Sequence, residues 1–240
     1  MKNMLETKEL YRIGAATVAG GILLLLTGCQ AMLQGVAGSR ADQQLIARAA
    51  LPGYVPGEYF VYDDGTSVLV TGVAKGLVSW KHHNGSVSQG YPNFIIPALS
   101  WRSATHSSQG TTAAPPDFLW PLAAGNQGRF TFHQTLSTEE GKPPEQTSRN
   151  WVCAVEGTSR VKVPAGEFDT VVIACKGYAR AEGAGGVTGF LERVEEFFGV
   201  VRLFYYAPEL GHYVLREDRQ MGLPKSRRAL VSNSFNSTLL

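Results

Sequence analysis

Hydrophobic residues follow two different patterns along this chain. Residues 15–26 form one apolar stretch, whereas from Tyr54 onward apolar residues come in short runs that alternate with polar ones. A period of two is typical of β-strands that bury one face, and no stretch after residue 55 keeps a helical period over ten residues. The pattern therefore predicts an apolar N-terminal segment followed by an all-β domain.

The expected strands are short and separated by turn residues. Phe130–Leu136 alternates in the strand period, and the β-branched run Thr170–Lys176 is typical of a strand at the centre of a sheet. Asn84-Gly85 predicts a tight hairpin turn. Two stretches rich in loop formers, Gln109–Pro116 and Gly141–Ser148, are expected to be exposed loops. We expect roughly ten to twelve strands in total.

So many strands in one sheet must protect their edges. A sheet of this size curls, closes or stacks to do so. All-β domains of this length commonly form one unit. We therefore predict a single curled antiparallel sheet or half-open barrel over residues 54–240.

The apolar N-terminal stretch has the features of an export signal. It is twelve residues long, within the ~7–15 of a signal-peptide core and below the ~20 needed to span a bilayer. At its end, Leu26-Thr27-Gly28-Cys29 resembles the lipobox of bacterial lipoprotein precursors. The alternative is an uncleaved N-terminal membrane helix. We expect a signal peptide at residues 1–28 and a lipidated N-terminus and tether at residues 29–53.

The lipobox resemblance implies a specific modification of Cys29. Its thiol would take a diacylglyceryl group, and the amino group exposed by cleavage would take a further acyl chain such as palmitate. An anchor of two or more chains holds a protein stably at a membrane. Gln30 follows in place of Asp. By resemblance to enterobacterial sorting, this implies transfer to the outer membrane if the host has one.

Composition excludes some partners and indicates the redox state. The chain has 22 Lys and Arg against 20 Asp and Glu, and this near-neutrality argues against a nucleic-acid surface. Besides Cys29, two cysteines remain, Cys153 and Cys175. Export would place both in an oxidising compartment, and on neighbouring antiparallel strands they can form a disulfide. The alternative is two buried free thiols.

No catalytic or metal-binding motif stands out. Only His82 and His83 are close in sequence among the histidines, and adjacent residues on a strand point to opposite faces, so they would not chelate one ion. Glu192 and Glu196 would share a strand face, either as an acid–base pair or as part of a solvated surface. We expect no catalytic residue, no metal and no cofactor.

Aromatic residues are the candidates for a binding site. The residues singled out are Trp80, Trp101, Trp120 and Tyr205. Such side chains either line an apolar pocket in a curled sheet or fill the core. Both interpretations remain open, and the first suits a lipid or acyl-chain ligand.

Three stretches together resemble a known group of proteins: Gly57–Thr66, Val161–Thr170 and Tyr205–Glu217. They resemble an uncharacterised family of exported bacterial β-domains related to the LolA/LolB-like half-open barrels. The resemblance extends over residues 55–220. It implies a curled sheet with a concave face and assigns no catalytic residue.

Three functions fit these observations. The first, which we expect, is a lipid-anchored, non-enzymatic module of the bacterial cell envelope that binds a lipid or another apolar ligand. The second is a structural or assembly-associated lipoprotein that binds another envelope protein through an exposed apolar patch or edge strand. The third is an envelope hydrolase that uses carboxylates such as Glu192 and Glu196.

Overall fold

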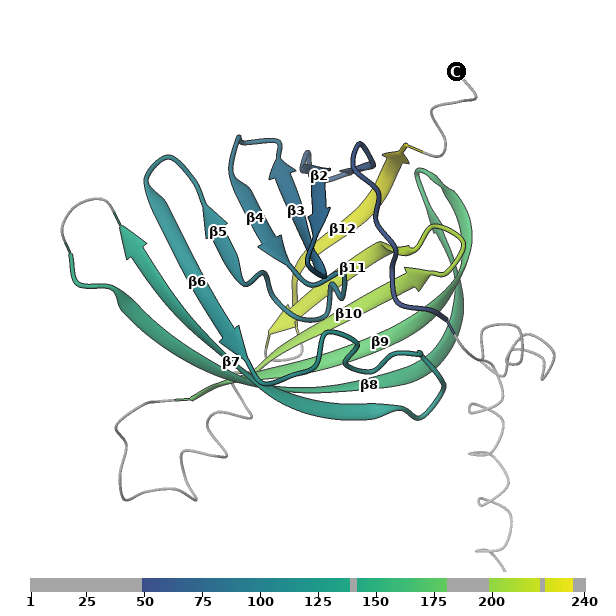
Figure 1. The fold of residues 1–240 in the computed structure, drawn as a ribbon. Coiled ribbons are helices and arrows are strands. Elements are labelled where there is room, and N and C mark those ends of the chain that lie inside the picture. The colour runs from purple at the N-terminus through teal and green to yellow at the C-terminus, as the bar shows by residue number, and fades with distance from the viewer. Residues whose placement is uncertain (1–48, 139–141, 181–198, 221–222, 235–240) are drawn as a thin grey trace, which may run out of the picture. The chain divides into compact units, whose positions relative to one another are not determined.

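The computed structural model describes residues 49–138, 142–180, 199–220 and 223–234, which belong to one compact unit (Figure 1). Within the described ranges, no helix is long and apolar enough to cross a membrane. The predicted leader, the lipidation site Cys29 and the pair Glu192 and Glu196 all lie outside these ranges.

The described part of the chain folds into twelve strands, each antiparallel to its neighbours. The all-β class predicted from the sequence is therefore confirmed. The strands are β1 Tyr59–Tyr62, β2 Ser67–Ala74, β3 Leu77–His82, β4 Val87–Gly90, β5 Ser100–Arg102, β6 His106–Thr112, β7 Gln127–Thr138, β8 Glu145–Val163, β9 Gly166–Arg180, β10 Val200–Ala207, β11 His212–Gln220 and β12 Leu223–Asn233.

The sheet closes into a barrel, so the predicted half-open shape was wrong. Strand β1 pairs with β2 on one side and with β12 on the other (Figure 1). Ion pairs of Arg227 with Asp63 (3.0 Å) and of Arg228 with Asp64 (2.8 Å) hold the β1–β2 turn against β12. Closure satisfies backbone groups that would otherwise form two open edges. The sequence pattern did not reveal it because Arg227 and Asp63 are 164 positions apart.

Both predicted loops contain strand residues. Strand β6 includes the first residues of Gln109–Pro116, and β8 begins at Glu145 inside the other predicted loop. In β6 a small residue is required, because a Cβ atom on Gly110 would collide with the ring of Phe132 on β7. Small polar residues are typical of loops. In β6 they form a strand paired with β7, and Gly110 leaves room there for the ring of Phe132.

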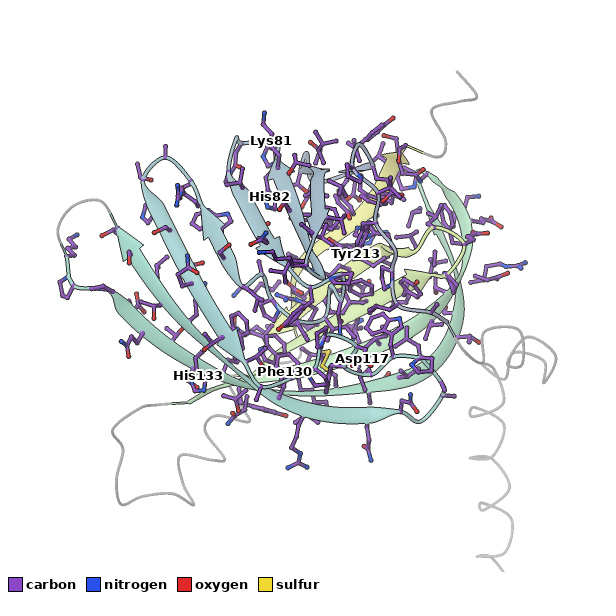
Figure 2. The ribbon with its side chains drawn as sticks, viewed as in Figure 1. Lys81, His82, Asp117, Phe130, His133 and Tyr213 are labelled. Carbon is purple, nitrogen blue, oxygen red and sulfur yellow. A yellow bond between two sulfur atoms is a disulfide. The ribbon has the colours of Figure 1, made fainter. Side chains whose placement is uncertain are left out.

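Aromatic side chains fill the interior of the barrel. Along β10, Phe204 and Tyr206 are buried while Tyr205 between them is partly exposed. Phe130 on β7 and Tyr213 on β11 are also buried, and Figure 2 shows both within the ring of strands. The alternation predicted from the sequence therefore separates an inner from an outer face.

Residues 49–54, which we call the N-terminal strap, are part of this folded unit. The amide of Leu122 donates a hydrogen bond to the carbonyl oxygen of Ala49 (3.1 Å). The indole N–H of Trp120 donates to the carbonyl oxygen of Ala50 (2.9 Å). Packing therefore begins within the segment that the sequence assigned to the tether.

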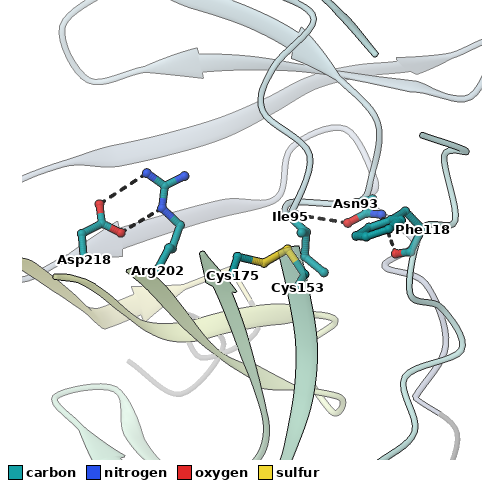
Figure 3. Close-up of a disulfide and its surroundings, with 7 residues drawn as sticks. All are labelled: Asn93, Ile95, Phe118, Cys153, Cys175, Arg202 and Asp218. Atoms are coloured by element: carbon teal, nitrogen blue, oxygen red, sulfur yellow. Dashed lines mark hydrogen bonds and ion pairs between the residues drawn. A yellow bond between two sulfur atoms is a disulfide. The ribbon is translucent and has the colours of Figure 1, made fainter. Parts of the chain in front are cut away.

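Strands β8 and β9 are joined by the disulfide that the sequence predicted. Cys153 and Cys175 lie directly opposite each other, are bonded and are buried (Figure 3). The register then shifts next to Gly157, which has a φ of +145°. Such a bulge bends a strand pair. Beyond it the hairpin reaches β12, where the amide of Ala165 donates to the carbonyl oxygen of Leu230 (3.0 Å).

Candidate functional site

A buried histidine lies among the aromatic side chains. His212 Nδ1 is 2.6 Å from the hydroxyl of Tyr54, and its Nε2 is 2.7 Å from the hydroxyl of Tyr62. A neutral imidazole accepts at one nitrogen and donates at the other, so the two tyrosines satisfy both. The ring of Phe60 stacks on His212 with centroids 3.9 Å apart. The histidine thus ties β11 to the N-terminal strap and to β1.

Burial keeps these three polar groups uncharged. Desolvation lowers the pKa of His212 to about 3 and raises the pKa of Tyr54 and Tyr62 well above the ordinary tyrosine value. A general acid or base needs a pKa near the working pH and contact with its substrate. His212 is only 3% exposed and has neither property. We conclude that it holds the fold together.

The four aromatic residues predicted to bind a ligand do not form one site. Trp80 packs in the core with its ring centroid 6.2 Å from that of His212. Trp101 lies on β5 and is partly exposed. Tyr205 on β10 is partly exposed and packs against the core. Trp120 is buried but borders a depression in the surface.

The segment between β6 and β7 forms this depression, which has a volume of about 350 Å³. Phe118 and Trp120 are buried beneath it, whereas Asp117 is exposed (labelled in Figure 2). Ligand pockets typically have volumes of about 300–1,000 Å³ and combine an apolar lining with a few polar groups. The depression reaches the lower end of this volume range, although its exposed lining is more polar than apolar. Its lining residues are Pro115, Asp117, Phe118, Leu119, Trp120, Asn126 and Gln127.

The backbone of the depression is strained and held in place by side chains. Leu119 has a φ of +70°, in a region that residues with a Cβ rarely adopt. The side-chain amide of Asn126 donates to the carbonyl oxygens of Leu119 (3.3 Å) and Pro121 (3.0 Å). The side-chain amide of Asn93 donates to the carbonyl oxygen of Phe118 (3.0 Å). Strain maintained in this way is concentrated at binding and catalytic sites.

Charged side chains form a second feature, on the inner face of the barrel. Arg202 of β10 and Arg216 of β11 share Asp218, each at 2.8 Å from one of its carboxylate oxygens. Figure 3 shows Arg202 and Asp218 near the disulfide. Burial alone would raise the pKa of Asp218, but the two arginines hold it below its ordinary value. Two cations share one anion, so this trio carries a net positive charge.

The ring of Trp151 brings a third arginine to this trio. It lies over Gly177, where a Cβ atom would approach the ring to 2.8 Å. The guanidinium carbon of Arg202 is 5.5 Å from the centroid of the ring, and that of Arg149 is 5.8 Å from it. Both distances are within the range of cation–π attraction. We call Arg149, Arg202 and Arg216 the arginine cluster.

The described residues offer little for metal or carboxylate chemistry. Within those ranges, no three His, Cys, Asp or Glu side chains gather closely enough to hold a metal ion. Glu192 and Glu196 lie outside the ranges. Their role as an acid–base pair therefore stays a prediction.

Sequence reasoning missed both His212 and the arginine cluster. His212 has no partner at a recognisable spacing, because Tyr54 and Tyr62 are far away along the chain. The run Arg216-Glu217-Asp218-Arg219 is charged at every position. Its alternation in β11 therefore gave no sign of which pair points inward.

Comparisons with known proteins give distant likenesses. No family model and no curated protein matches the chain. It is similar to the hypothetical lipoprotein YmcC from Escherichia coli, with 11% identity, a TM-score of 0.46, and coverage of 80% of this chain and 89% of that one. A candidate exported protein with a YmcC-like fold from Bacteroides fragilis is 14% identical, with a TM-score of 0.47 and coverage of 78% of this chain and 100% of that one. A candidate lipoprotein from Parabacteroides distasonis is 8% identical, with a TM-score of 0.38 and coverage of 78% of this chain and 99% of that one. These scores carry no argument about family or function, and the relation to LolA/LolB-like barrels stays a prediction.

Proposed function

We propose that this protein is a lipid-anchored, non-enzymatic binding module of the bacterial cell envelope that takes an acyl chain or a similar apolar ligand. The depression between β6 and β7 carries the proposal. The partly exposed side chain of Leu119, over the buried rings of Phe118 and Trp120, supports an acyl chain as the ligand, and polar groups lie beside it.

The proposed site differs from the one that the sequence suggested. A curled sheet would have bound the ligand on its concave face. In the barrel, part of that face is occupied by the ring stack of Phe60 and His212 and by the neighbouring ring of Trp80. We therefore place the ligand at the surface depression beside Trp120.

The anchor is the second part of the proposal. Cys29 follows a lipobox-like stretch, and the proposed diacylglyceryl and acyl chains would fix the protein to the envelope membrane, in the outer membrane if the host has one. Cells grown with labelled palmitate are expected to label the wild-type protein and not the variant Cys29→Ala. Equal labelling of both proteins would contradict the anchor.

The assembly hypothesis finds less support. It requires an edge strand or an exposed apolar patch. Among the described strands each one is paired on both sides. Single exposed apolar side chains such as Val87 and Leu69 are ordinary on protein surfaces. No specific observation favours this function over ligand binding.

Photocrosslinking in cells tests the proposed ligand site. Cells that express the full chain are fed a fatty acid carrying a diazirine group and irradiated, and the labelled peptides are mapped by mass spectrometry. We expect labelling within residues 115–127 to fall about tenfold in Leu119→Gln, which places a polar group in the depression. Val87→Gln, a matched change on an exposed strand, should leave the labelling unchanged. Labelling that is absent from residues 115–127, or equal in both variants, would contradict the proposal.

A further inference from the structure

The arginine cluster suggests a second binding site, which the proposed function does not use. We propose that Arg149, Arg202 and Arg216 bind the anionic headgroup, a carboxylate or a phosphate, of a ligand that also carries an apolar chain. The site lies on the inner face of β8, β10 and β11 and does not depend on the depression beside Trp120.

The charge balance of the cluster is the first argument. Asp218 is the carboxylate within ion-pair distance of Arg202 and Arg216. No carboxylate of the described ranges forms an ion pair with Arg149, whose contact is the ring of Trp151. Within the described ranges, the three guanidinium groups of the cluster thus have one carboxylate, Asp218, as their ion-pair partner. Unbalanced positive charge is unfavourable in a partly buried position, and an anionic ligand would relieve it.

The lowered pKa of Arg202 supports this argument. Burial, followed by the charge of Arg216, lowers the pKa of Arg202 below the ordinary arginine value, although Asp218 acts in the other direction. The charged form of Arg202 is therefore under-compensated where it stands. An added oxyanion would stabilise that form in the same way as Asp218 does.

The guanidinium groups can be reached from solvent. The side chains of Arg202 and Arg216 keep 23% and 24% of their exposure, whereas that of Asp218 keeps 9%. The cations are thus more accessible than the carboxylate between them. Arginine presents paired N–H donors that match the geometry of carboxylates and phosphates. An incoming headgroup can accept from these donors without displacing Asp218.

Aromatic rings beside the cluster account for the apolar chain of the ligand. Arg202 lies 5.9 Å from the ring centroid of Phe204, in addition to its contact with Trp151. Phe130 stacks on Trp151 with centroids 6.3 Å apart. The three rings are buried and adjoin the partly exposed arginines, so the site brings apolar carbon and cations together. A molecule with both an anionic and an apolar part is complementary to it.

Tryptophan fluorescence of the full chain in uncharged detergent micelles tests the site, because Trp151 contacts two of the arginines. The protein is titrated with oleate, with oleyl alcohol and with inorganic phosphate at a constant micelle concentration. We expect saturable binding of oleate, and at least about tenfold weaker binding of both other probes, because each lacks one half of the recognised chemistry.

Charge variants locate the binding. Arg149→Gln should weaken the binding of oleate about tenfold, and this variant breaks no ion pair among the residues that the structure describes. Arg216→Gln should also weaken the binding of oleate. The control is Arg160→Gln, which makes the same change of charge on β8 but at an exposed ion pair with Asp169, and it should bind oleate like the wild type.

Three results would overturn the proposal. The first is equal affinity for oleate and oleyl alcohol, which would show that the site does not recognise the anionic headgroup. The second is equal affinity for phosphate and oleate, which would show that the site binds a free oxyanion and does not recognise an apolar chain. The third is an unchanged oleate affinity in Arg149→Gln and Arg216→Gln. Failure of the depression as a ligand site would instead appear in the crosslinking of residues 115–127 and would leave these titrations unaffected.

Discussion

At the scale of single residues, burial decides which polar groups hold the fold and which are free to act. His212 is enclosed by Tyr54, Tyr62 and Phe60, so its neutral form is the stable one. Arg202 is partly exposed and remains charged beside Asp218. The same barrel interior thus contains a neutral structural network and a charged, accessible one.

Acid should destabilise the protein through His212. Its pKa is about 3 in the folded state and about 6.5 when unfolded, so below pH 6.5 the unfolded state binds the proton more readily. The stabilisation is complete above pH 6.5 and is lost as the pH falls towards 3, at about 1.4 kcal/mol per pH unit. Urea unfolding of the wild type and of His212→Gln between pH 7 and pH 4 measures this loss.

Comparison of the wild type with His212→Gln separates the effect of the histidine on stability from the effects of the carboxylates. Glutamine keeps a donor and an acceptor between the two tyrosines but does not titrate. Acid effects from Asp64, Asp169 and Asp218, whose pKa values are lowered by their partners, occur in both proteins and cancel in the difference. Parallel pH dependence of the two free energies of unfolding would contradict the prediction.

A second prediction concerns the glycine beneath Trp151. Gly177→Ala should lower the free energy of unfolding by about 1–3 kcal/mol, because the new Cβ atom would lie 2.8 Å from the ring and force it to move. Gly72→Ala, also in a strand, meets no atom within 4 Å and should be neutral or slightly stabilising. Thermal unfolding of both variants measures the difference. A loss of equal size in both would show that the ring position is not responsible.

At the scale of elements, the hairpin of β8 and β9 organises much of the barrel. It carries the disulfide, positions Trp151 and Arg149 on its inner face, and reaches β12 through Ala165. Its alternating pattern was readable in the sequence. The bend at Gly157 was not, because a bulge is one residue out of register and leaves the composition unchanged.

The disulfide should stabilise this hairpin measurably. Cys153 and Cys175 are 22 positions apart, and closing a loop of this length restricts the unfolded chain by about 3 kcal/mol. The double variant Cys153→Ala and Cys175→Ala should lose about that much in urea unfolding. Thiol labelling of the denatured, unreduced wild type should leave both cysteines unmodified. Labels on peptides that contain them would contradict the bridge.

At the scale of the whole molecule, closure between β1 and β12 turns the sheet into a barrel. The carboxylate of Asp63 contributes twice, since it pairs with Arg227 (3.0 Å) and accepts from the amide of Ala229 (2.7 Å). A four-residue strand is short for such a task. Side-chain contacts from the adjoining turn therefore reinforce the backbone pairing.

Hydrogen exchange tests the closure. In a closed barrel the amides of both β1 and β12 are bonded within the sheet, so they should exchange slowly, like those of β10. Asp63→Ala should accelerate exchange around Ala229 and leave β6 unchanged, because the lost acceptor belongs to the closure alone. Rapid exchange at alternate amides of β1 in the wild type would indicate an open edge and contradict the barrel.

The sequence by itself determined the properties that depend on neighbours along the chain. Alternation identified strands such as Phe130–Leu136, and the placement of Cys153 and Cys175 in two strand-like runs predicted their bridge. These inferences succeeded because the period of a strand and its facing residues are local properties.

Only the tertiary structure decided the closure of the barrel and the arginine cluster. The partners concerned are far apart in the sequence, as with Arg227 and Asp63, or with Trp151, which meets Arg202 across Gly177. A charged residue in a strand looks the same in sequence whether it points outward or inward. Its direction is fixed by the curvature and register of the whole sheet, which arise when distant strands pair.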